Sequence, residues 1–588
     1  MKKALSIDIP RTLAFAAAFS IVSLPVLVFS QYGWYPQIHL FKWAVAFSVV
    51  AYGAGSCAIM LATQRGEVQV ARTDLAWLAL LLLLALQVVF VPVRNFPEWL
   101  RNWYFFAAIG GAVFLLRNLP IGDVLPAILR SVAVTGGISV IFGFIRRFYP
   151  AADIPFIFDI SMAPDRFVAN TGMDNILGVY LALSVLAGCW LLICARRARG
   201  IPMTVFDASL LTLNAAGMWM TGSRSALLSC AVGVAVFILA LRPNARQIKR
   251  MAVFLTVALA IFISVAYIAP NALEVQRRDM SGSLSMENLS PAREGRYAIW
   301  GISLEVIKAA PVFGVGLGNY KWNYMDAMAT FREKSDIPPR YTYWAHSEYL
   351  QLLAEVGVVG AAPFFFLIFY YIWLAAKSLK GEHSQALVWA LAAVAVLAVD
   401  SCFSRPFHRV DTAFTLSLAL SLISKFCVSP VAFGRVARIV VGGAIFLVSF
   451  SGVALFAQGF SDQKYLGEYF YSSSYIVIDP SNVREQDKYP LMLEDAYLQL
   501  IARENYIRAL TDFGDKDEND KNYRDAVRVL TKYFMTEPRY PELNMLMFLY
   551  QTRGEWSEGE KYFKYYPEDE REKFLRGEFE GTYMKEQS

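Results

Sequence analysis

The residue best suited to acid–base chemistry is His346, one of four histidines in the chain. It begins the run His-Ser-Glu-Tyr-Leu-Gln-Leu-Leu-Ala-Glu-Val-Gly, whose apolar spacing predicts an amphipathic helix. The positive end of a helix dipole lowers the pKa of an imidazole and keeps it neutral near pH 7, as a general base must be. Glu348 and Glu355 are seven residues apart and share one helix face, which Glu348 does not share with His346. The run predicts a general base at His346 and two carboxylates that either bind substrate hydroxyls or face solvent.

Three arginines stand out by their position. Arg224 closes the turn Thr221-Gly222-Ser223-Arg224 between two apolar stretches, Arg296 begins an apolar-periodic helix, and Arg166 precedes another apolar stretch. A guanidinium at membrane depth is costly and is therefore normally paired and functional. Its planar fork also suits phosphate, with which it forms bidentate, always-charged hydrogen bonds. Each arginine is a candidate phosphate ligand, and the alternative for each is an interfacial anchor or a salt bridge.

Other motifs with possible chemistry are weaker. His39, His383 and His408 lack such surroundings, and the six cysteines show no zinc or redox spacing, so free thiols are expected. The run from Gly314 to Asn319 lacks the spacing of a dinucleotide loop, and no Walker motif is present. No acidic metal cluster such as Asp-x-Asp occurs in a predicted outer loop. We expect no metal, no cofactor and no nucleic-acid partner.

The elements that carry these residues are predicted to be membrane-spanning helices. The chain has 588 residues, of which 56% are hydrophobic and 18% charged, with a mean hydropathy of +0.40. Soluble domains carry about a quarter charged residues, and a span takes roughly 20 apolar residues. The sequence therefore predicts an all-α, polytopic transmembrane bundle. About thirteen candidate spans are 13–30, 41–61, 75–91, 99–115, 124–144, 176–195, 206–221, 225–241, 251–269, 358–376, 387–399, 412–426 and 439–457.

The positions of Lys and Arg predict the orientation of these spans. With a cytoplasmic N-terminus, every inner loop is basic and most are short, which fits the positive-inside rule; the opposite orientation does not. The first span lacks a cleavage site and is interpreted as a retained helix. The segments 149–175, 270–343 and 400–411 are then outside, and an odd number of spans places the C-terminus outside. The spans flanking Gly222 are short, so one broken hairpin is an alternative there.

Two domains are expected. Residues 1–457 form the transmembrane domain, with a large outer loop and loop-end helix at 270–357, and residues 458–588 form a helical soluble domain. Within the latter, Ala526, Pro538, Gly554 and Pro567 follow about the spacing of a tetratricopeptide-type helix pair. A helical tail without repeat ancestry is the alternative. Since no catalytic constellation occurs in it, this domain is predicted to be a scaffold or a surface for a protein partner.

Several of these stretches, in this order, resemble the O-antigen ligase family, which includes O-antigen ligases, repeat-unit polymerases and pilin-type protein O-oligosaccharyltransferases. The matching pieces are the Thr221–Arg224 turn, Arg296 with Trp300 four residues later, the run from Ala310 to Asn319, and the run that begins at His346. The last is the most specific. The similarity covers roughly residues 166 to 400, and the preceding spans fit the family's topology.

The resemblance implies a helical membrane glycosyltransferase of the C type, multi-pass in the bacterial inner membrane. It would move a glycan from undecaprenyl diphosphate to an acceptor hydroxyl on the periplasmic face. The family's functional residues correspond to Arg224, Arg296 and His346 here. Candidate substrate-binding residues are Arg166, Trp300, Glu348, Glu355, Arg405 and His408. The basic segment 401–409 and the soluble tail depart from the family pattern, and both concern the acceptor.

Several functions stay open at this point. Ligation to lipid A–core is favoured, and polymerisation of repeat units or transfer to a protein would use the same donor site. A lipid-glycan flippase predicts charged groups near mid-membrane and internally repeated halves, neither of which the sequence shows. A non-catalytic assembly protein that binds partners through its tail is a further alternative.

Overall fold

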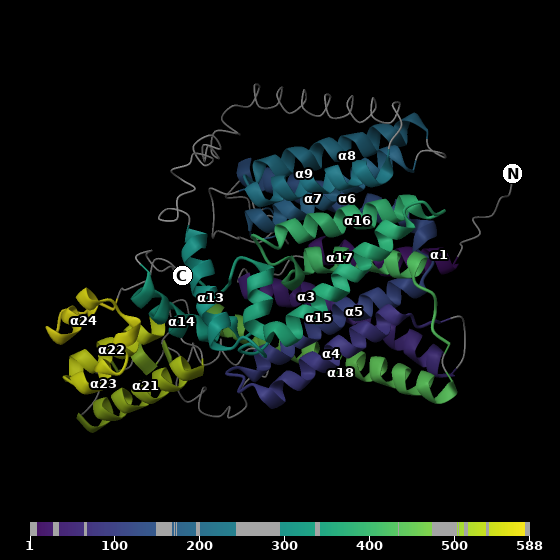
Figure 1. Cartoon of the computed structure of the whole chain (residues 1–588). Coiled ribbons are helices and arrows are strands. Elements are labelled where there is room, and N and C mark those ends of the chain that lie inside the picture. The colour runs from purple at the N-terminus through teal and green to yellow at the C-terminus, as the bar shows by residue number, and fades with distance from the viewer. Residues whose placement is uncertain are drawn as a thin grey trace. The chain divides into compact units, whose positions relative to one another are not determined.

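The computed structural model describes most of the chain as helices (Figure 1). The described residues are 9–27, 35–63, 68–148, 167, 169, 171, 173–195, 200–242, 295–335, 342–432, 434–472, 502–503, 505–507, 509–510, 516–536 and 540–581. Contacts among Cα atoms divide the chain into two compact units. Unit 1 consists of Met1–Leu82, Tyr104–Ser285 and Pro363–Phe456, and unit 2 of Leu83–Trp103, Met286–Ala362 and Ala457–Ser588.

Unit 1 contains most of the long apolar helices. They are α1 (Ile9–Val22), α2 (Leu24–Leu27), α3 (Tyr35–Thr63), α6 (Ile121–Phe148), α7 (Asp174–Ile193), α8 (Ile201–Met220), α9 (Arg224–Leu241), α16 (Ser384–Asp400) and α17 (Val410–Cys427). It also holds parts of α4 (Arg72–Phe90), α5 (Phe96–Asn118), α15 (Glu348–Ser378) and α18 (Arg435–Ser472). Helices α6, α7, α8, α9 and α16 pack against one another, and Figure 1 shows them side by side.

Helix α7 lies at the centre of this packing because it is apolar on all sides. Its apolar window is 94% buried, as expected for a helix without a polar face. Small residues let the neighbouring helices approach closely. A Cβ atom on Gly136 of α6 would lie 2.6 Å from the Ser184 hydroxyl of α7, and one on Gly233 of α9 would lie 2.4 Å from Val396 of α16. The bundle therefore depends on close helix contacts at glycine.

The predicted membrane spans agree with the described helices. Nine described helices are long and apolar enough to cross a membrane, which makes this a multi-pass membrane protein. Two shorter apolar helices, α1 and α16, and the less apolar α8 account for the remaining predicted spans in the described ranges. The predicted span 251–269 lies outside the described residues. Helices α8 and α9 are separate, joined by the turn at 221–223, so the hairpin near Gly222 consists of two full helices.

Unit 2 combines the large loop with the C-terminal segment. Its helices include α13 (Gly295–Ala309) and α14 (Tyr320–Lys334) from the loop, and α21 (Lys516–Thr536), α22 (Tyr540–Arg553), α23 (Trp556–Glu560) and α24 (Glu568–Leu575) from the tail. One hydrophobic core contains Tyr324 and Met328 of α14 together with Tyr533 and Leu546 of the tail. The predicted helix pair around Ala526 is present as α21 and α22, and its tetratricopeptide identity stays a prediction. The loop and the tail therefore form one packed body.

The predicted boundary at residue 457 falls within a helix. Helix α18 runs without interruption from Arg435 to Ser472, and its apolar part ends at Ala454. The change in composition near residue 457 thus marks where the helix stops being apolar, while the helix itself continues. The proposed division into residues 1–457 and 458–588 stays a prediction.

Candidate functional site

His346 lies directly before α15, at a backbone turn. Its φ is +48°, a left-handed conformation that few residues other than glycine adopt. The side chain is half-buried, and its Nε2 atom lies 3.5 Å from the Thr342 hydroxyl. Glu348, which begins α15, is fully buried. The structure therefore places the predicted base at the N-terminal end of a helix, in a conformation that must be held by its surroundings.

A glycine-rich loop supports this segment. The backbone amides of Val315 and Gly316 donate to the carbonyls of Ala354 and Glu355, each at 2.9 Å, and the Gly318 amide donates to Glu355 Oε2 at 2.8 Å. A Cβ atom on Gly314 would lie 2.3 Å from the Glu355 carbonyl oxygen. Only glycine allows this approach, so the run that superficially resembles a nucleotide loop is a support for α15.

Helix α15 is broken at Gly357, where φ is +60° and ψ is −170°. The break would leave backbone groups without helical partners, which is costly in a membrane protein unless other groups bind them. The amides of Val358 and Val359 donate instead to the carbonyls of Pro311 and Val312, at 3.0 and 3.1 Å. The loop thus replaces the missing helical hydrogen bonds.

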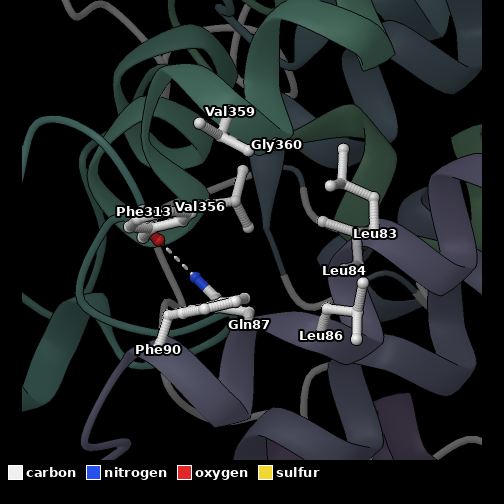
Figure 2. Close-up of a pocket in the computed structure, with 9 residues that line it drawn as sticks. All are labelled: Leu83, Leu84, Leu86, Gln87, Phe90, Phe313, Val356, Val359 and Gly360. Atoms are coloured by element: carbon white, nitrogen blue, oxygen red, sulfur yellow. Dashed lines mark hydrogen bonds between the residues drawn. The ribbon is translucent and has the colours of Figure 1, made fainter.

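Gln87, near the end of α4, is hydrogen-bonded to both the glycine-rich loop and α15 (Figure 2). Its Nε2 atom donates to the carbonyls of Phe313 and Glu355 at 2.6 and 2.7 Å, and its Oε1 accepts from the Leu317 amide and the Trp99 indole, both at 3.0 Å. All of its amide capacity is therefore used within unit 2. Gln87 is also the one polar side chain lining an otherwise apolar hollow, whose other lining residues are Leu83, Leu84, Leu86, Phe90, Phe313, Val356, Val359 and Gly360.

Arg296, the predicted arginine that lies in unit 2, is the second residue of α13. It is half-buried, as is Trp300 one turn later. Helix α13 packs on α14, and Ser303 shares a 2.7 Å hydrogen bond with Tyr320. The same hydrophobic core contains Ala298 of α13 and both Ala345 and Ala354. Arg296 and His346 are thus carried by one packed body.

Glu355 is almost fully buried, and both of its carboxylate oxygens bind protein groups. Oε2 accepts from the Gly318 amide, and Oε1 accepts from Gln351 Nε2 at 2.6 Å. A carboxylate in this position is suited to holding the loop against the helix. Its role in substrate binding stays a prediction.

Arg224 lies in unit 1, at the first turn of α9. Gly222 has φ +62°, and the Ser223 hydroxyl caps the helix by accepting from the Ala226 amide at 3.4 Å. The first turns of α7 press on this turn, because a Cβ on Gly178 would lie 3.0 Å from the Thr221 hydroxyl and 3.1 Å from Ser223 Cβ. Arg224 is half-buried. The serine-arginine turn is therefore capped by Ser223 and packed closely against α7, with Arg224 as the first residue of α9.

The basic segment 401–409 belongs to the same end of unit 1. Trp190, near the end of α7, donates to the carbonyl of Gln385, near the start of α16, at 2.8 Å. The two helices therefore run antiparallel, and the end of α16 at Asp400 lies near the start of α7. Arg409 Nη2 contacts Met173 Sδ, at the N-cap of α7, at 3.6 Å. The α7 N-terminus therefore lies between the Arg224 turn and the 401–409 segment.

Arg405 and Arg409 are both buried in this segment. His408 is half-buried, with its ring edge-to-face with Phe106 at 5.8 Å. Two buried carboxylates, Asp400 and Asp411, flank them. This segment is therefore a region of buried charge of both signs within unit 1.

The structure groups the predicted residues into two sets. His346, Arg296, Trp300, Glu348 and Glu355 belong to unit 2, and Arg224, Arg405 and His408 belong to unit 1. Arg166 lies outside the described residues. No group of three or more His, Cys, Asp or Glu with metal-binding geometry occurs in the ranges that the structure describes.

The sequence analysis did not single out four polar residues that the structure places in the two units: Gln87, Gln351, Lys321 and Arg409. Gln87 and Gln351 each interrupt an apolar run, and a polar side chain there is expected to have a partner, which is a signal that could have identified them. Lys321, buried and 3.8 Å from Glu98, gave no such signal. Arg409 was included in a basic segment without a role of its own.

Residues 208–365 match a family model described as O-antigen ligase. The match includes Arg224, Arg296, the glycine-rich loop and the run that begins at His346. No curated protein matches the chain.

Proposed function

Because this membrane protein belongs to the O-antigen ligase family, whose members are glycosyltransferase-type enzymes, we propose that it transfers a glycan from a polyprenyl diphosphate carrier to an acceptor hydroxyl. The observation that carries the proposal is the geometry of the matched segment. The glycine-rich loop and broken helix α15 hold His346 in a fixed left-handed turn, and the serine-capped turn places Arg224 at the start of α9.

The proposed reaction is a displacement at the anomeric carbon. His346 takes the proton of the acceptor hydroxyl, the acceptor oxygen bonds to the anomeric carbon, and the bond from that carbon to the phosphate oxygen breaks. The electron pair of the broken bond leaves on the carrier diphosphate. Arg224 and Arg296 stabilise this developing negative charge. Losing one such contact typically costs about 3 kcal/mol, or roughly a hundredfold in rate.

The remaining predicted residues have supporting roles in this proposal. The buried Arg405 and Arg409 contribute positive charge at the Arg224 end of unit 1, and the half-buried His408 lies between them in the sequence. Arg166, which precedes α7 in the sequence, is proposed to act with them. Trp300 and Glu348 lie on the elements that carry Arg296 and His346. We assign them to sugar binding.

The proposed location is the bacterial inner membrane, with the N-terminus in the cytoplasm. Unit 2 then faces the periplasm, including the tail, and the site is periplasmic. The basic inner loops and the packing of the loop with the tail in one body support this orientation.

We favour ligation to lipid A–core as the specific reaction. Repeat-unit polymerisation and transfer to a protein are the alternatives, and all three require the same donor chemistry. The test is a gene deletion complemented with wild type or His346→Ala at equal protein levels, in which lipopolysaccharide ladders, released polysaccharide and glycoprotein bands are profiled side by side. We expect one of the three to be lost in the deletion and in His346→Ala. Normal glycan profiles in all three would refute the proposal and favour a flippase or an assembly protein.

A further inference from the structure

Gln351, in the first turn of α15, is fully buried. Its Oε1 atom accepts from the Ala345 amide at 2.8 Å, and its Nε2 atom donates to Glu355 Oε1 at 2.6 Å. The second oxygen of Glu355 accepts from the Gly318 amide at 2.8 Å. These hydrogen bonds form a continuous chain from the glycine-rich loop to the backbone N–H of Ala345, the residue directly before His346.

The polarity of this chain is fixed. An amide side chain has one accepting oxygen and a donating NH₂ group, whereas an ionised carboxylate only accepts. The Ala345 N–H requires an acceptor, and Glu355 requires a donor, so the amide of Gln351 satisfies both in one orientation only. Buried networks of this kind are stable when every member is satisfied and costly when one is not.

The hydrogen-bond chain ends next to His346, whose backbone is strained. His346 has φ +48°, which is unfavourable for a residue other than glycine and persists only where the surroundings hold it. Gln351 anchors the amide of Ala345, and the N–H of Gln351 itself donates to the Ser347 carbonyl at 2.9 Å. The two residues that flank His346 in the sequence are thus both hydrogen-bonded to Gln351.

We propose that Gln351 is a positioning residue that, through Glu355 and Gly318, holds the His346 imidazole at the geometry of the reaction. This inference rests on the proposed role of His346 as the base and assigns Glu355 to the same support. A displacement of about 1 Å in a reacting group can cost on the order of a hundredfold in rate. The turnover of the enzyme should therefore depend on the polarity of this hydrogen-bond chain.

The test exchanges the two side chains. Gln351→Glu places two carboxylates against each other, and Glu355→Gln leaves one oxygen to accept from two donors, so each single variant breaks the chain. In the double variant Gln351→Glu/Glu355→Gln, Glu at 351 accepts from the Ala345 amide and from the amide at 355, whose oxygen accepts from Gly318. All three hydrogen bonds return with their donors and acceptors in place. Gln385→Glu, at an exposed position at the start of α16, is the matched control for the added charge.

The readouts separate positioning from folding. In membranes with equal amounts of inserted protein, we expect each single variant to lower kcat by about a hundredfold with little change in donor KM, and the double variant to recover most of it. The rate at which diethyl pyrocarbonate modifies His346, followed by mass spectrometry, should change in the single variants and return in the double variant. His383 provides the internal reference, being exposed at the start of α16.

Either of two results would overturn the inference: unchanged kcat and His346 reactivity in both single variants, or single variants that lose inserted protein while the folded fraction keeps its kcat. The proposed function fails separately, when wild type shows no transfer or His346→Ala transfers normally. The reactivity of His346 does not depend on transfer activity, so the two failures are distinguishable.

Discussion

Gly357 passes so close to Gly314 that a Cβ atom on Gly357 would lie 2.6 Å from the Gly314 amide nitrogen and 2.3 Å from the Val312 carbonyl oxygen. Both glycines have positive φ, at +60° and +71°. The contact is between two backbones, so neither can yield by rotating a side chain. The break in α15 and the glycine-rich loop are therefore one structural feature.

Gly357→Ala should destabilise the protein and abolish transfer. Overpacking and the unfavourable φ together are expected to cost about 1–3 kcal/mol or more, because the clash is with backbone atoms. The measurement is thermal unfolding in detergent together with the amount of inserted protein. Gly443→Ala, at a helical position of α18 with no atom within 4 Å of the added Cβ, is the control and should be neutral or slightly stabilising. Equal melting temperatures for both variants would contradict the coupling of loop and helix break.

Arg224→Ala should reduce transfer by about a hundredfold while leaving the protein inserted, because a contact to the leaving diphosphate is lost. Arg224→Lys should show a smaller loss, since it keeps the charge but not the planar fork. The measurement is kcat and donor KM in membranes. Arg242→Lys, at the exposed opposite end of the same helix, should behave as wild type. Full activity of Arg224→Ala would remove Arg224 from the proposed mechanism.

The C-terminal helices should depend on Asp326. This carboxylate accepts from Arg94 Nη2 at 2.8 Å, Lys564 Nζ at 3.0 Å and Tyr565 Oη at 2.8 Å. Burial raises its pKa, but these hydrogen bonds outweigh burial and lower the pKa below the ordinary value. A lowered pKa in the folded state stabilises the fold above the unfolded pKa, and this contribution is lost as the pH falls through the folded pKa.

Asp326→Asn should therefore destabilise unit 2 at neutral pH by about 1 kcal/mol, a modest value because the side chain is partly exposed. Its difference from wild type should shrink below about pH 4, as wild-type Asp326 itself becomes protonated. Limited proteolysis of α21–α24 and thermal unfolding at several pH values measure this. Asp525→Asn, which breaks an exposed pair with Arg528, should change little. A pH-independent difference for Asp326→Asn would contradict the electrostatic explanation.

The orientation predicts which cysteines react with a membrane-impermeant maleimide. Cys402 is exposed, next to Asp400 at the Arg224 end of unit 1, and should be labelled in spheroplasts. A cysteine at the exposed position Glu560 of α23, in a Cys402→Ser background, should be labelled as well. His383→Cys in that background should react only after lysis. Labelling of His383→Cys in intact spheroplasts would reverse the proposed topology.

Much of the fold followed from the sequence because apolar length and basic loops are local signals. The runs that predicted spans near α7, α9 and α17 are continuous in the chain, and the helices follow them. The continuation of α18 to Ser472 was not predictable from hydropathy, since a helix does not end where its apolar character ends. The packing of α14 with α21 and α22 joins segments some 200 residues apart and left no local signal.

The sequence identified candidate residues by type and position, but not the hydrogen bonds that support the segments carrying them. His346 and the arginines were identified by their position near predicted helix ends. The roles of Gln87, Gln351 and Glu355 arise from four hydrogen bonds. Three of these join residues that are about 30 to 270 positions apart in the sequence, such as Gln87 and Glu355. Spacing predicted that Glu355 shares a face with Glu348, but it could not predict that Gly318 would occupy its carboxylate.

The most direct test of the central claim is transfer by the purified full-length protein in liposomes supplied with an undecaprenyl diphosphate-linked glycan and the acceptor identified by profiling. We expect release of undecaprenyl diphosphate with stoichiometric formation of the glycosylated acceptor, reduced about a hundredfold or more in His346→Ala protein of equal stability. A donor that stays intact with wild-type protein, or equal transfer by His346→Ala, would contradict the account.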